Sequence, residues 1–410
     1  MARSSDESRF NAPRRAFLAL GAGGLALLAA GGGTAAMLLR RINAIGRYPE
    51  AELARLRQGA VNPLFATYPA LARRIPWRPL GRLPTPIEEL PPPEGAAAGL
   101  RLFVKRDDLS SGVYGGNKVR KLEHFLAEAE LAKRRTLVTL GGIGSNHALA
   151  TALHGAALGF ETDLVLYDQP VTPFVRRNLG GFAHAGARVH YGGSIPASFA
   201  TAGRLMARRR REGAEPYFIM VGGTTPLGCI GHVSAALELA QQVEDGAMPE
   251  PDRLFIPLGT CGTAIGLLVG LRLAGLKTRV TAVRVADPIS ANATVVRWMA
   301  QGLADLLHEA DPTLPDLRID EADFDLLTDF YGPGYGFPTG PAEAAVRWAE
   351  PRLALETTYT GKALAACLDF ARKAEPETVC LFWNTFSSAR VPEPAAVEGL
   401  PGRLARIARG

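Results

Sequence analysis

The segment "SGVYGGNKVRKLEHFLAEAE", residues 111–130, places a tight loop directly before a predicted helix. Val119, Leu122 and Phe125 recur at three- and four-residue spacing, which gives the predicted helix one apolar face. Two glycines and an asparagine precede this helix, and Lys118 stands at its mouth. Lysine usually belongs on a solvated surface, so from this segment alone an ordinary surface lysine is the alternative to a specific role for Lys118.

The chain on either side of this loop alternates short apolar runs with helical patterns. With 410 residues and 47% hydrophobic content, it can bury a large core, as two domains or one large α/β unit. The runs "TLVTLGG", "TDLVLYD" and "RLFIPLG" are typical of buried strands, and a helical pattern follows each of them. The sequence therefore predicts doubly wound parallel sheets, in which ligands bind at the carboxyl ends of the strands.

Composition narrows the classes of function. The formal net charge is only +6, and the basic cluster 208–211 reads as the polar end of a helix because no aromatic residues interleave with it. Nucleic-acid binding is therefore not predicted. The four cysteines lack paired spacing, and no histidine–cysteine cluster has the spacing of a metal site, so we expect neither a metal nor disulfides.

Residues 1–41 predict a membrane-targeting segment. An uncharged stretch at 16–39 is long enough to span a bilayer, and Arg14-Arg15 before it resembles the twin-arginine export signal. Arg40 and Arg41 follow at once, as at the end of an anchor. Both interpretations stay open, so we expect a protein associated with the membrane through this segment or exported to the periplasm.

The loop "GTCGTAIG", residues 259–266, has the construction of a phosphate cradle. Its glycines let the backbone approach a ligand, Thr260 and Thr263 add hydroxyls, and the following helix points its N-terminus into the loop. It matches neither the Walker pattern nor the dinucleotide fingerprint, and a simple strand–helix turn is the alternative.

Polar side chains also follow other predicted strands. Ser145 and Asn146 stand where a strand gives way to a helix, and they could cap that helix or bind an anionic or phenolic ligand. Tyr335 and Tyr359 each precede a glycine in a loop, although a single tyrosine is more often a core residue. Thr385 lies in "LFWNTFSS", which ends the last strand.

A phosphate cradle together with a loop lysine suggests pyridoxal phosphate. This cofactor needs a lysine amine, donors for its phosphate and a partner for its pyridine nitrogen. Lys118 is the predicted lysine. Lys105, inside a strand-like run, and Lys121, one turn into the helix, are its rivals, and we expect Lys121 to reach the surface.

Five motifs then show a specific resemblance. The segments "VKRDDLSSGVYGGNKVRKLEHFLAEA", "LVTLGGIGSNHALATA", "GTCGTAIGL", "YGFPT" and "YTGKAL" resemble, in this order, the D-cysteine desulfhydrase and 1-aminocyclopropane-1-carboxylate (ACC) deaminase family. The resemblance implies a fold type II, tryptophan synthase β-like enzyme with pyridoxal 5'-phosphate, usually a homodimer. It also implies a small α/β domain at 121–228, set into a larger one formed by 42–120 and 229–400.

The resemblance assigns a role to each strand-end residue. Lys118 would bind the cofactor covalently and move the Cα proton, Asn146 would hydrogen-bond the cofactor's 3-hydroxyl, and Thr385 would face its pyridine nitrogen. The phosphate would be held by Gly259, Thr260, Cys261, Gly262 and Thr263. The substrate would contact Ser145, Asn146, His147, Tyr335 and Tyr359, and the catalytic set would be Lys118, Ser145, Tyr335 and Tyr359.

Two threonines favour one branch of this family. ACC deaminases typically carry glutamate after the second tyrosine and leucine in the last strand-end motif, whereas this chain has Thr360 and Thr385, as desulfhydrases do. The expected reaction is β-elimination from D-cysteine to sulfide, pyruvate and ammonia. ACC deamination and elimination from another D-amino acid are the alternatives. Phe386 replaces a family glycine, which also leaves open a membrane-tethered binding protein without turnover.

Overall fold

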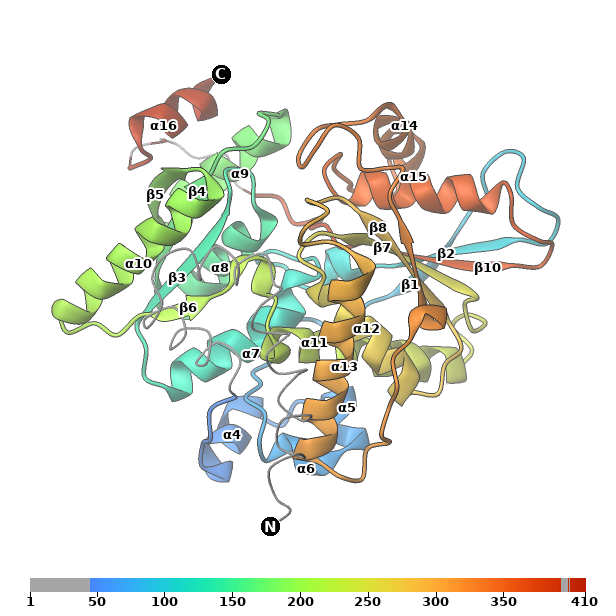
Figure 1. The fold of residues 1–410 in the computed structure, drawn as a ribbon, viewed down its shortest axis with the longest axis horizontal. Coiled ribbons are helices and arrows are strands. Elements are labelled where there is room, and N and C mark those ends of the chain that lie inside the picture. Colours follow the sequence, from blue (N-terminus) through green and yellow to red (C-terminus); the bar gives the residue numbers. More distant parts are fainter. Residues whose placement is uncertain (1–44, 392–396, 398) are drawn as a thin grey trace, which may run out of the picture.

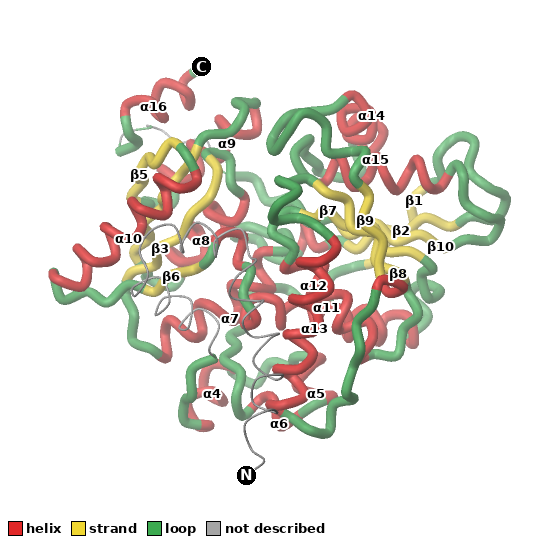
Figure 2. The backbone as a smooth tube through the Cα atoms, in the orientation of Figure 1, coloured by secondary structure: helices red, strands yellow, loops and turns green. Residues whose placement is uncertain are grey.

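The computed structural model describes residues 45–391, 397 and 399–410. Its strands form two separate sheets, with helices packed on both faces of each, as Figure 1 and Figure 2 show. The predicted targeting segment, residues 1–41, lies outside the described part of the chain. Within that part, no helix combines the length and the apolar character needed to cross a membrane.

The larger sheet has six strands in the order β1-β2-β10-β7-β8-β9. Its neighbours pair in parallel except for the edge strand β1, which pairs antiparallel with β2 through Leu90 and Leu102. The parallel prediction is therefore wrong for β1, because a short connection can join only antiparallel neighbours. The strands are β1 (Ile87–Leu90), β2 (Arg101–Lys105), β7 (Arg253–Leu258), β8 (Arg279–Arg284), β9 (Phe324–Leu327) and β10 (Val379–Trp383).

Both faces of this sheet are buried, since alternate residues of one strand belong to two different apolar clusters. In β10, Cys380 and Phe382 pack with α15 (Thr360–Ala371), whereas Leu381 and Trp383 join the main core on the other side. This burial explains the continuous apolar runs that the sequence shows for such strands.

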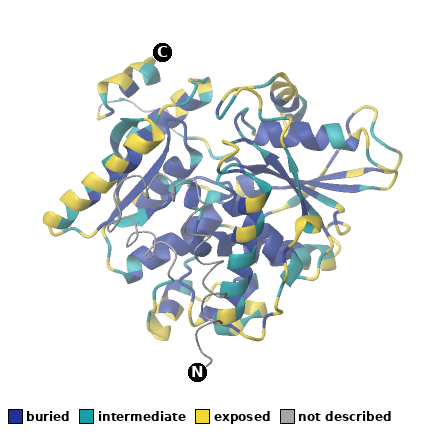
Figure 3. Ribbon diagram, in the orientation of Figure 1, coloured by how far each residue is buried: buried dark blue, intermediate teal, exposed yellow. Residues whose placement is uncertain are grey.

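The smaller sheet has four parallel strands in the order β5-β4-β3-β6. One face packs against α8 (Asn146–Ala157) and the other against α10 (Ile195–Arg211). The basic cluster 208–211 forms the last turn of α10, as predicted, and Figure 3 shows how much of this helix faces solvent. The strands are β3 (Thr136–Gly142), β4 (Glu161–Tyr167), β5 (Arg188–Gly193) and β6 (Tyr217–Ile219).

Helix α7 (Lys118–Leu131) lies between the two sheets and packs against α11 (Pro226–Glu244) (Figure 1). A side chain at Gly231 would lie 2.0 Å from the Arg120 carbonyl oxygen, so glycine allows this close contact. The other helices are α4 (Glu50–Arg57), α5 (Pro63–Thr67), α6 (Pro69–Ala72), α9 (Pro173–His184), α12 (Gly262–Leu273), α13 (Ala293–Ala310), α14 (Gly340–Ala349) and α16 (Gly402–Arg409).

Candidate active site

A cavity of about 390 Å³ lies among the loops that follow β3, β4, β7, β8 and β10. Its position at the carboxyl ends of parallel strands agrees with the general rule for ligand sites in such sheets. The cavity brings together every residue that the sequence predicted for the site. These are Lys118, Ser145, Asn146, His147, Gly259, Thr260, Cys261, Gly262, Thr263, Tyr335, Tyr359 and Thr385.

Lys118 is the first residue of α7, and the last strand-end loop fixes its backbone. The Asn117 amide donates to the Thr385 carbonyl oxygen at 3.2 Å. Gly116 has φ +89°, and a Cβ there would lie 2.4 Å from the Phe386 carbonyl oxygen, so only glycine fits. The backbone of residues 116 and 117 therefore packs tightly on the loop after β10. This packing fixes the position of Lys118, which lines the cavity.

The Lys118 amine has no hydrogen-bond partner among the described residues. The residue lines the cavity and is partly buried. Burial, and after it the positive charge of Lys121, lower the pKa of Lys118 well below the ordinary lysine value. Burial therefore favours the neutral amine, which is the form that attacks a carbonyl carbon or accepts a proton.

The glycine loop before α12 presents an anion-binding surface. Cys261 takes the left-handed conformation, with φ 68°, which turns the chain sharply into the helix. The Thr263 hydroxyl accepts from the Asn117 amide nitrogen Nδ2 at 2.8 Å, and the Thr260 hydroxyl accepts from Thr224 at 2.7 Å. The first bond ties the loop to the Lys118 loop, and the second ties it to the segment before α11. The first backbone N–H groups of α12 have no partner within the helix.

Lys121 corrects a sequence prediction, because its side chain is buried and does not reach the surface. Its amine donates to the Gly222 carbonyl oxygen at 3.0 Å, and a Cβ at Gly262 would lie 2.7 Å from it. Burial lowers the pKa of Lys121 to about 8, so the amine keeps its positive charge at neutral pH. Lys121 therefore adds a cation to the anion-binding loop, and its three-residue spacing from Lys118 was the available signal.

The loop after β3 divides its tasks between two residues. Ser145 caps α8, since its hydroxyl accepts from the Ala148 amide at 3.1 Å, as the capping interpretation predicts. Asn146 does not cap the helix. Its Oδ1 atom accepts from Tyr114 at 2.8 Å and from Asn178 at 3.2 Å. These contacts fix the amide orientation and leave Nδ2 as a donor for a ligand oxygen.

Tyr335 and Tyr359 meet in the cavity, where their hydroxyl oxygens are 2.5 Å apart and their rings pack edge to face. Burial raises the pKa of both hydroxyls above the ordinary tyrosine value. Both therefore stay protonated, and the pair can donate or pass a proton but does not carry a charge. Tyr167, at the end of β4, lines the same cavity and was missed, since nothing near it in sequence marked it.

Glu356 is a second cavity-lining residue that the sequence reasoning missed. Its carboxylate accepts from the backbone amides of Thr358, Tyr359 and Thr360 at 2.7, 2.9 and 2.9 Å. The carboxylate thus satisfies the first amides of α15, and a glutamate four residues before the helix was the overlooked signal. The Thr360 hydroxyl also bonds to the Glu356 backbone. The Thr385 hydroxyl, in contrast, has no hydrogen-bond partner among the residues that the structure describes.

Phe386 forms part of the cavity wall and connects the loop after β10 with α9. Its ring packs edge to face on Phe174 of α9, with the ring centres 5.6 Å apart. The Arg177 guanidinium lies 5.1 Å from the centre of the Phe386 ring. The side chain that replaces the family glycine therefore fills space between the last strand-end loop and α9.

These residues fit pyridoxal phosphate. The anion-binding loop with Lys121 suits its phosphate, Lys118 suits its aldehyde, and the Asn146 Nδ2 and Thr385 hydroxyl are free for its ring oxygen and nitrogen. A family model described as pyridoxal-phosphate dependent enzyme matches residues 79–385. The chain belongs to this family and is a pyridoxal-phosphate enzyme.

Two relatives and one solved structure define the group more closely. D-cysteine desulfhydrase of Klebsiella pneumoniae (strain 342) is 33% identical over 72% of this chain and 88% of its own length. Nocardicin C-9' epimerase of Nocardia uniformis subsp. tsuyamanensis is 33% identical over 78% and 95%. An ACC deaminase homologue matches with TM-score 0.67 and 28% identity, over 80% of this chain and 96% of that one. The chain is a member of the D-cysteine desulfhydrase and ACC deaminase family.

Proposed function

We propose that the protein eliminates the β-substituent of a small amino acid, with D-cysteine as the substrate and sulfide, pyruvate and ammonia as the products. The observation that carries this proposal is that Lys118 and the anion-binding loop line one cavity, where burial lowers the pKa of the lysine amine. Bound pyridoxal phosphate supplies the electron sink for charge at the substrate Cα. Lys118 takes the Cα proton, and the α8 N-terminus at Ser145 orients the substrate carboxylate.

The choice of a thiol leaving group rests on the polar groups around the ring position. Thr385 offers a neutral hydroxyl to the pyridine nitrogen, and the Glu356 carboxylate is occupied by three backbone amides. A neutral partner leaves the ring a weaker electron sink than a carboxylate would. A weaker electron sink suffices when thiolate, a good leaving group, departs from the β-carbon. Opening the strained ring of ACC, which has no such leaving group, requires a stronger electron sink.

A second candidate, epimerisation at Cα, is favoured by the match to an epimerase along 95% of that relative's length. It shares the first step, removal of the Cα proton by Lys118. It differs because a proton is then returned to the opposite face of the substrate Cα. The Tyr335–Tyr359 pair is the candidate donor, since both hydroxyls hold their protons.

The decisive assay uses the full chain, purified with detergent and added pyridoxal phosphate. We expect sulfide and pyruvate from D-cysteine and little from L-cysteine. Appearance of 2-oxobutyrate from ACC would move the protein to the other branch. Interconversion of cysteine enantiomers without sulfide would favour the epimerase. A bound cofactor with no product from a panel of D-amino acids would favour a binding protein on the same fold.

The proposal extends to location and assembly. Residues 1–41 target the protein to the membrane, either as an anchor or as a twin-arginine signal, and the catalytic part works as a homodimer. The paired arginines and the uncharged stretch at 16–39 support the first point, and the family resemblance supports the second. Cell fractionation of the wild type and of Arg14→Lys/Arg15→Lys tests the targeting. Light scattering of the purified protein tests the dimer.

A further inference from the structure

The C-terminal end of α7 lies at the amino ends of the small-sheet strands, on the side away from the cavity. Residues 132–135 join α7 directly to β3, and the Tyr217 hydroxyl at the start of β6 donates to the Glu128 carboxylate of α7. Lys118, at the other end of this helix, lines the cavity. The 14 residues of α7 rise about 1.5 Å each, so roughly 20 Å separate its C-terminal end from the cavity.

Two further segments meet the end of α7 there. Leu53 and Leu56 of α4 share an apolar cluster with Leu131 of α7. The last turn of α10 is followed by Glu215, which pairs with Arg134 just beyond α7. Figure 1 shows α4 and the C-terminal ends of α7 and α10 along the lower left of the molecule. The three segments therefore form one surface.

This surface carries solvent-accessible basic side chains that have no carboxylate partner in the described part of the chain. We call it the basic face, and its members are Arg47, Lys133, Arg135, Arg210 and Arg211. Nearby, Glu130, Glu212 and Glu215 already pair with other arginines. Glu50 and Glu52, in the first turn of α4, offset part of the charge but not all of it. The face is therefore positively charged.

The chain enters the basic face at its first described residues. The Gly46 amide donates to the Glu128 carboxylate at 2.9 Å, which fixes this part of the chain beside the end of α7. The uncharged stretch that we propose as a membrane segment ends at Leu39, seven residues earlier, and an extended chain of that length reaches at most about 25 Å. A globular chain of this size has a radius of gyration of about 21 Å and is roughly 50 Å across. A stretch that stays in the bilayer therefore holds this side of the molecule against the membrane.

We propose that the basic face docks on a membrane surface and binds the anionic headgroups of its phospholipids. Each lysine or arginine within a Debye length of such a surface adds to the attraction. Docking turns the cavity away from the bilayer, so the enzyme takes its substrate from water and not from the lipid. The short tether favours a membrane over nucleic acid, and no aromatic residues interleave with the basic cluster 208–211.

This inference rests on the proposed targeting by residues 1–41, and flotation of the full chain with lipid vesicles shows which of the two fails. A chain that floats with zwitterionic and anionic vesicles alike, and stays bound in about 1 M salt, is anchored by residues 1–41. A chain that floats only with anionic vesicles and is released by salt is docked through the basic face without an anchor. A chain that floats with neither contradicts both proposals.

Fluorescence quenching tests the orientation of the docked protein. The four cysteines of the chain are buried, so a cysteine added on the surface can be labelled selectively. Ala54→Cys on α4 and Ala207→Cys on α10 place a fluorophore beside the basic face, whereas Ala344→Cys lies on α14, across the molecule (Figure 1). The vesicles contain phosphatidylglycerol, with a small fraction of lipid that carries a nitroxide on its headgroup.

We expect quenching beside the basic face to exceed that at Ala344→Cys by at least about fivefold, and to weaken in vesicles of phosphatidylcholine alone. Equal quenching at the three positions of the floated protein would overturn the proposal. So would the absence of quenching at Ala54→Cys and Ala207→Cys.

A charge-matched pair of variants tests whether the attraction is electrostatic. Arg210→Gln/Arg211→Gln removes charge from the basic face, and Arg347→Gln/Arg352→Gln removes the same charge on and just after α14. None of these arginines forms an ion pair with a described residue, so both variants should fold, and melting curves check this. We expect only the first variant to lower the quenching at Ala54→Cys, by at least about threefold at low salt. Equal effects of the two variants would overturn the proposal, as would binding of RNA through Arg210 and Arg211 without any quenching by lipid.

Discussion

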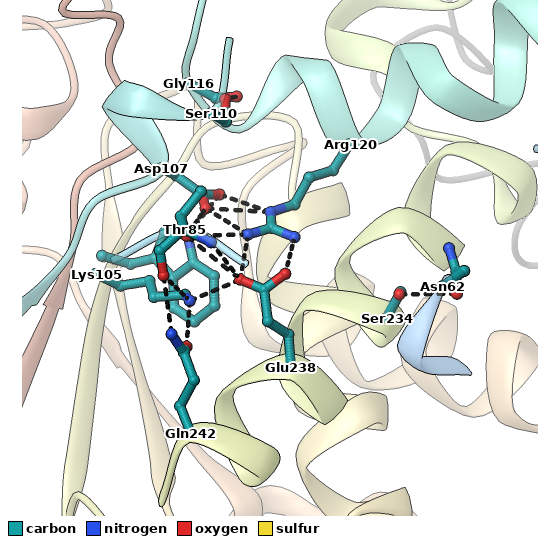
Figure 4. Close-up of polar contacts among 11 residues, drawn as sticks. Asn62, Thr85, Lys105, Asp107, Ser110, Gly116, Arg120, Ser234, Glu238 and Gln242 are labelled. Carbon is teal, nitrogen blue, oxygen red and sulfur yellow. Dashed lines mark hydrogen bonds and ion pairs between the residues drawn. The ribbon is translucent and has the colours of Figure 1, made fainter. Parts of the chain in front are cut away.

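The two sides of α7 treat buried positive charge in opposite ways. On the cavity side, the described part of the chain offers Lys118 no hydrogen-bond partner and offers the Lys121 amine a single carbonyl oxygen, that of Gly222. Burial lowers the pKa of both amines. On the other side, Arg120 is as buried as Lys121 but enters the cluster of ion pairs drawn in Figure 4. One helix thus carries lysines whose charged form is disfavoured by burial and an arginine whose charge is paired.

The buried cluster balances two cations with two carboxylates. Arg120 pairs with Asp107 at 2.7 Å and with Glu238 at 2.9 Å, and Lys105 pairs with Glu238 at 2.6 Å (Figure 4). Burial by itself would raise the pKa of Glu238, but Arg120 and Lys105 hold it at about 2. The cluster connects β2, α7 and α11, and Trp383 of β10 donates to Asp107 at 2.8 Å.

This contrast shows how the fold separates stability from reactivity. Paired charges keep their ordinary ionised forms and hold α7 against its neighbours, whereas the unpaired lysine is forced toward its neutral, reactive form. Lys105, a rival of Lys118 in the sequence, belongs to the cluster. Its three contacts leave no N–H free for a ligand.

The strongest test of the contrast removes the unpaired amine. Lys118→Ala should lower turnover by roughly a thousandfold or more and abolish the covalent link to the cofactor, because no other lysine in the cavity has a free amine. A visible spectrum and a product assay measure the two effects. Lys373→Ala, at an exposed ion pair, is the control, and turnover of Lys118→Ala at the wild-type rate would contradict the assignment.

The next test removes one partner from the cluster. Glu238→Gln should lower the free energy of unfolding by about 3–5 kcal/mol, since two buried cations then share one carboxylate. Urea unfolding followed by circular dichroism measures the loss. Arg208→Ala, at the exposed pair with Glu212, should change it by less than about 0.5 kcal/mol, and equal effects of the two substitutions would contradict the reading of the cluster.

As pH is lowered, the free energy of unfolding should fall first because of buried His124 and only at lower pH because of the ion-pair cluster. Burial lowers the pKa of His124 to about 4, so below pH 6.5 the unfolded chain binds a proton that the folded chain refuses. The free energy of unfolding should therefore fall between pH 6.5 and 4, by about 3 kcal/mol at roughly 1.4 kcal/mol per pKa unit. The Glu238 contribution is lost only as pH falls below 4.5 towards 2.

A matched variant isolates this histidine. His124 Nδ1 donates to the Pro76 carbonyl oxygen at 2.7 Å, and the side-chain amide of His124→Asn can replace that donor without titrating. Urea unfolding at several pH values should show a shallower acid slope for this variant than for the wild type. Identical slopes would mean that His124 does not resist protonation.

The smallest expected effect concerns Lys121. Lys121→Met should weaken binding of pyridoxal phosphate to the cofactor-free protein by roughly ten- to a hundredfold, because a charged donor beside the anion-binding loop is lost. A titration followed by absorbance measures the affinity, with Lys373→Met as the control. Unchanged affinity would show that the loop amides alone hold the phosphate.

Several features followed from the sequence alone because they depend on neighbours along the chain. The apolar runs and the helix after Lys118 were predicted from spacing, and the loop at 259–266 from its glycines and threonines. Helix α11 likewise begins where local chemistry favours it, since the Thr225 hydroxyl caps it and Pro226 occupies its first position.

The tertiary structure decided which polar side chains are buried and which hydrogen bonds they form, because both depend on segments far apart in the chain. Lys121 is predicted on the surface and is buried beneath Gly262, and Glu356 enters the cavity through its bonds to the start of α15. The His147 ring contacts the Thr139 hydroxyl, which donates to the Ile219 carbonyl oxygen of a neighbouring strand. Sequence spacing specifies the elements, whereas burial and hydrogen bonding between elements determine the charge state of each side chain.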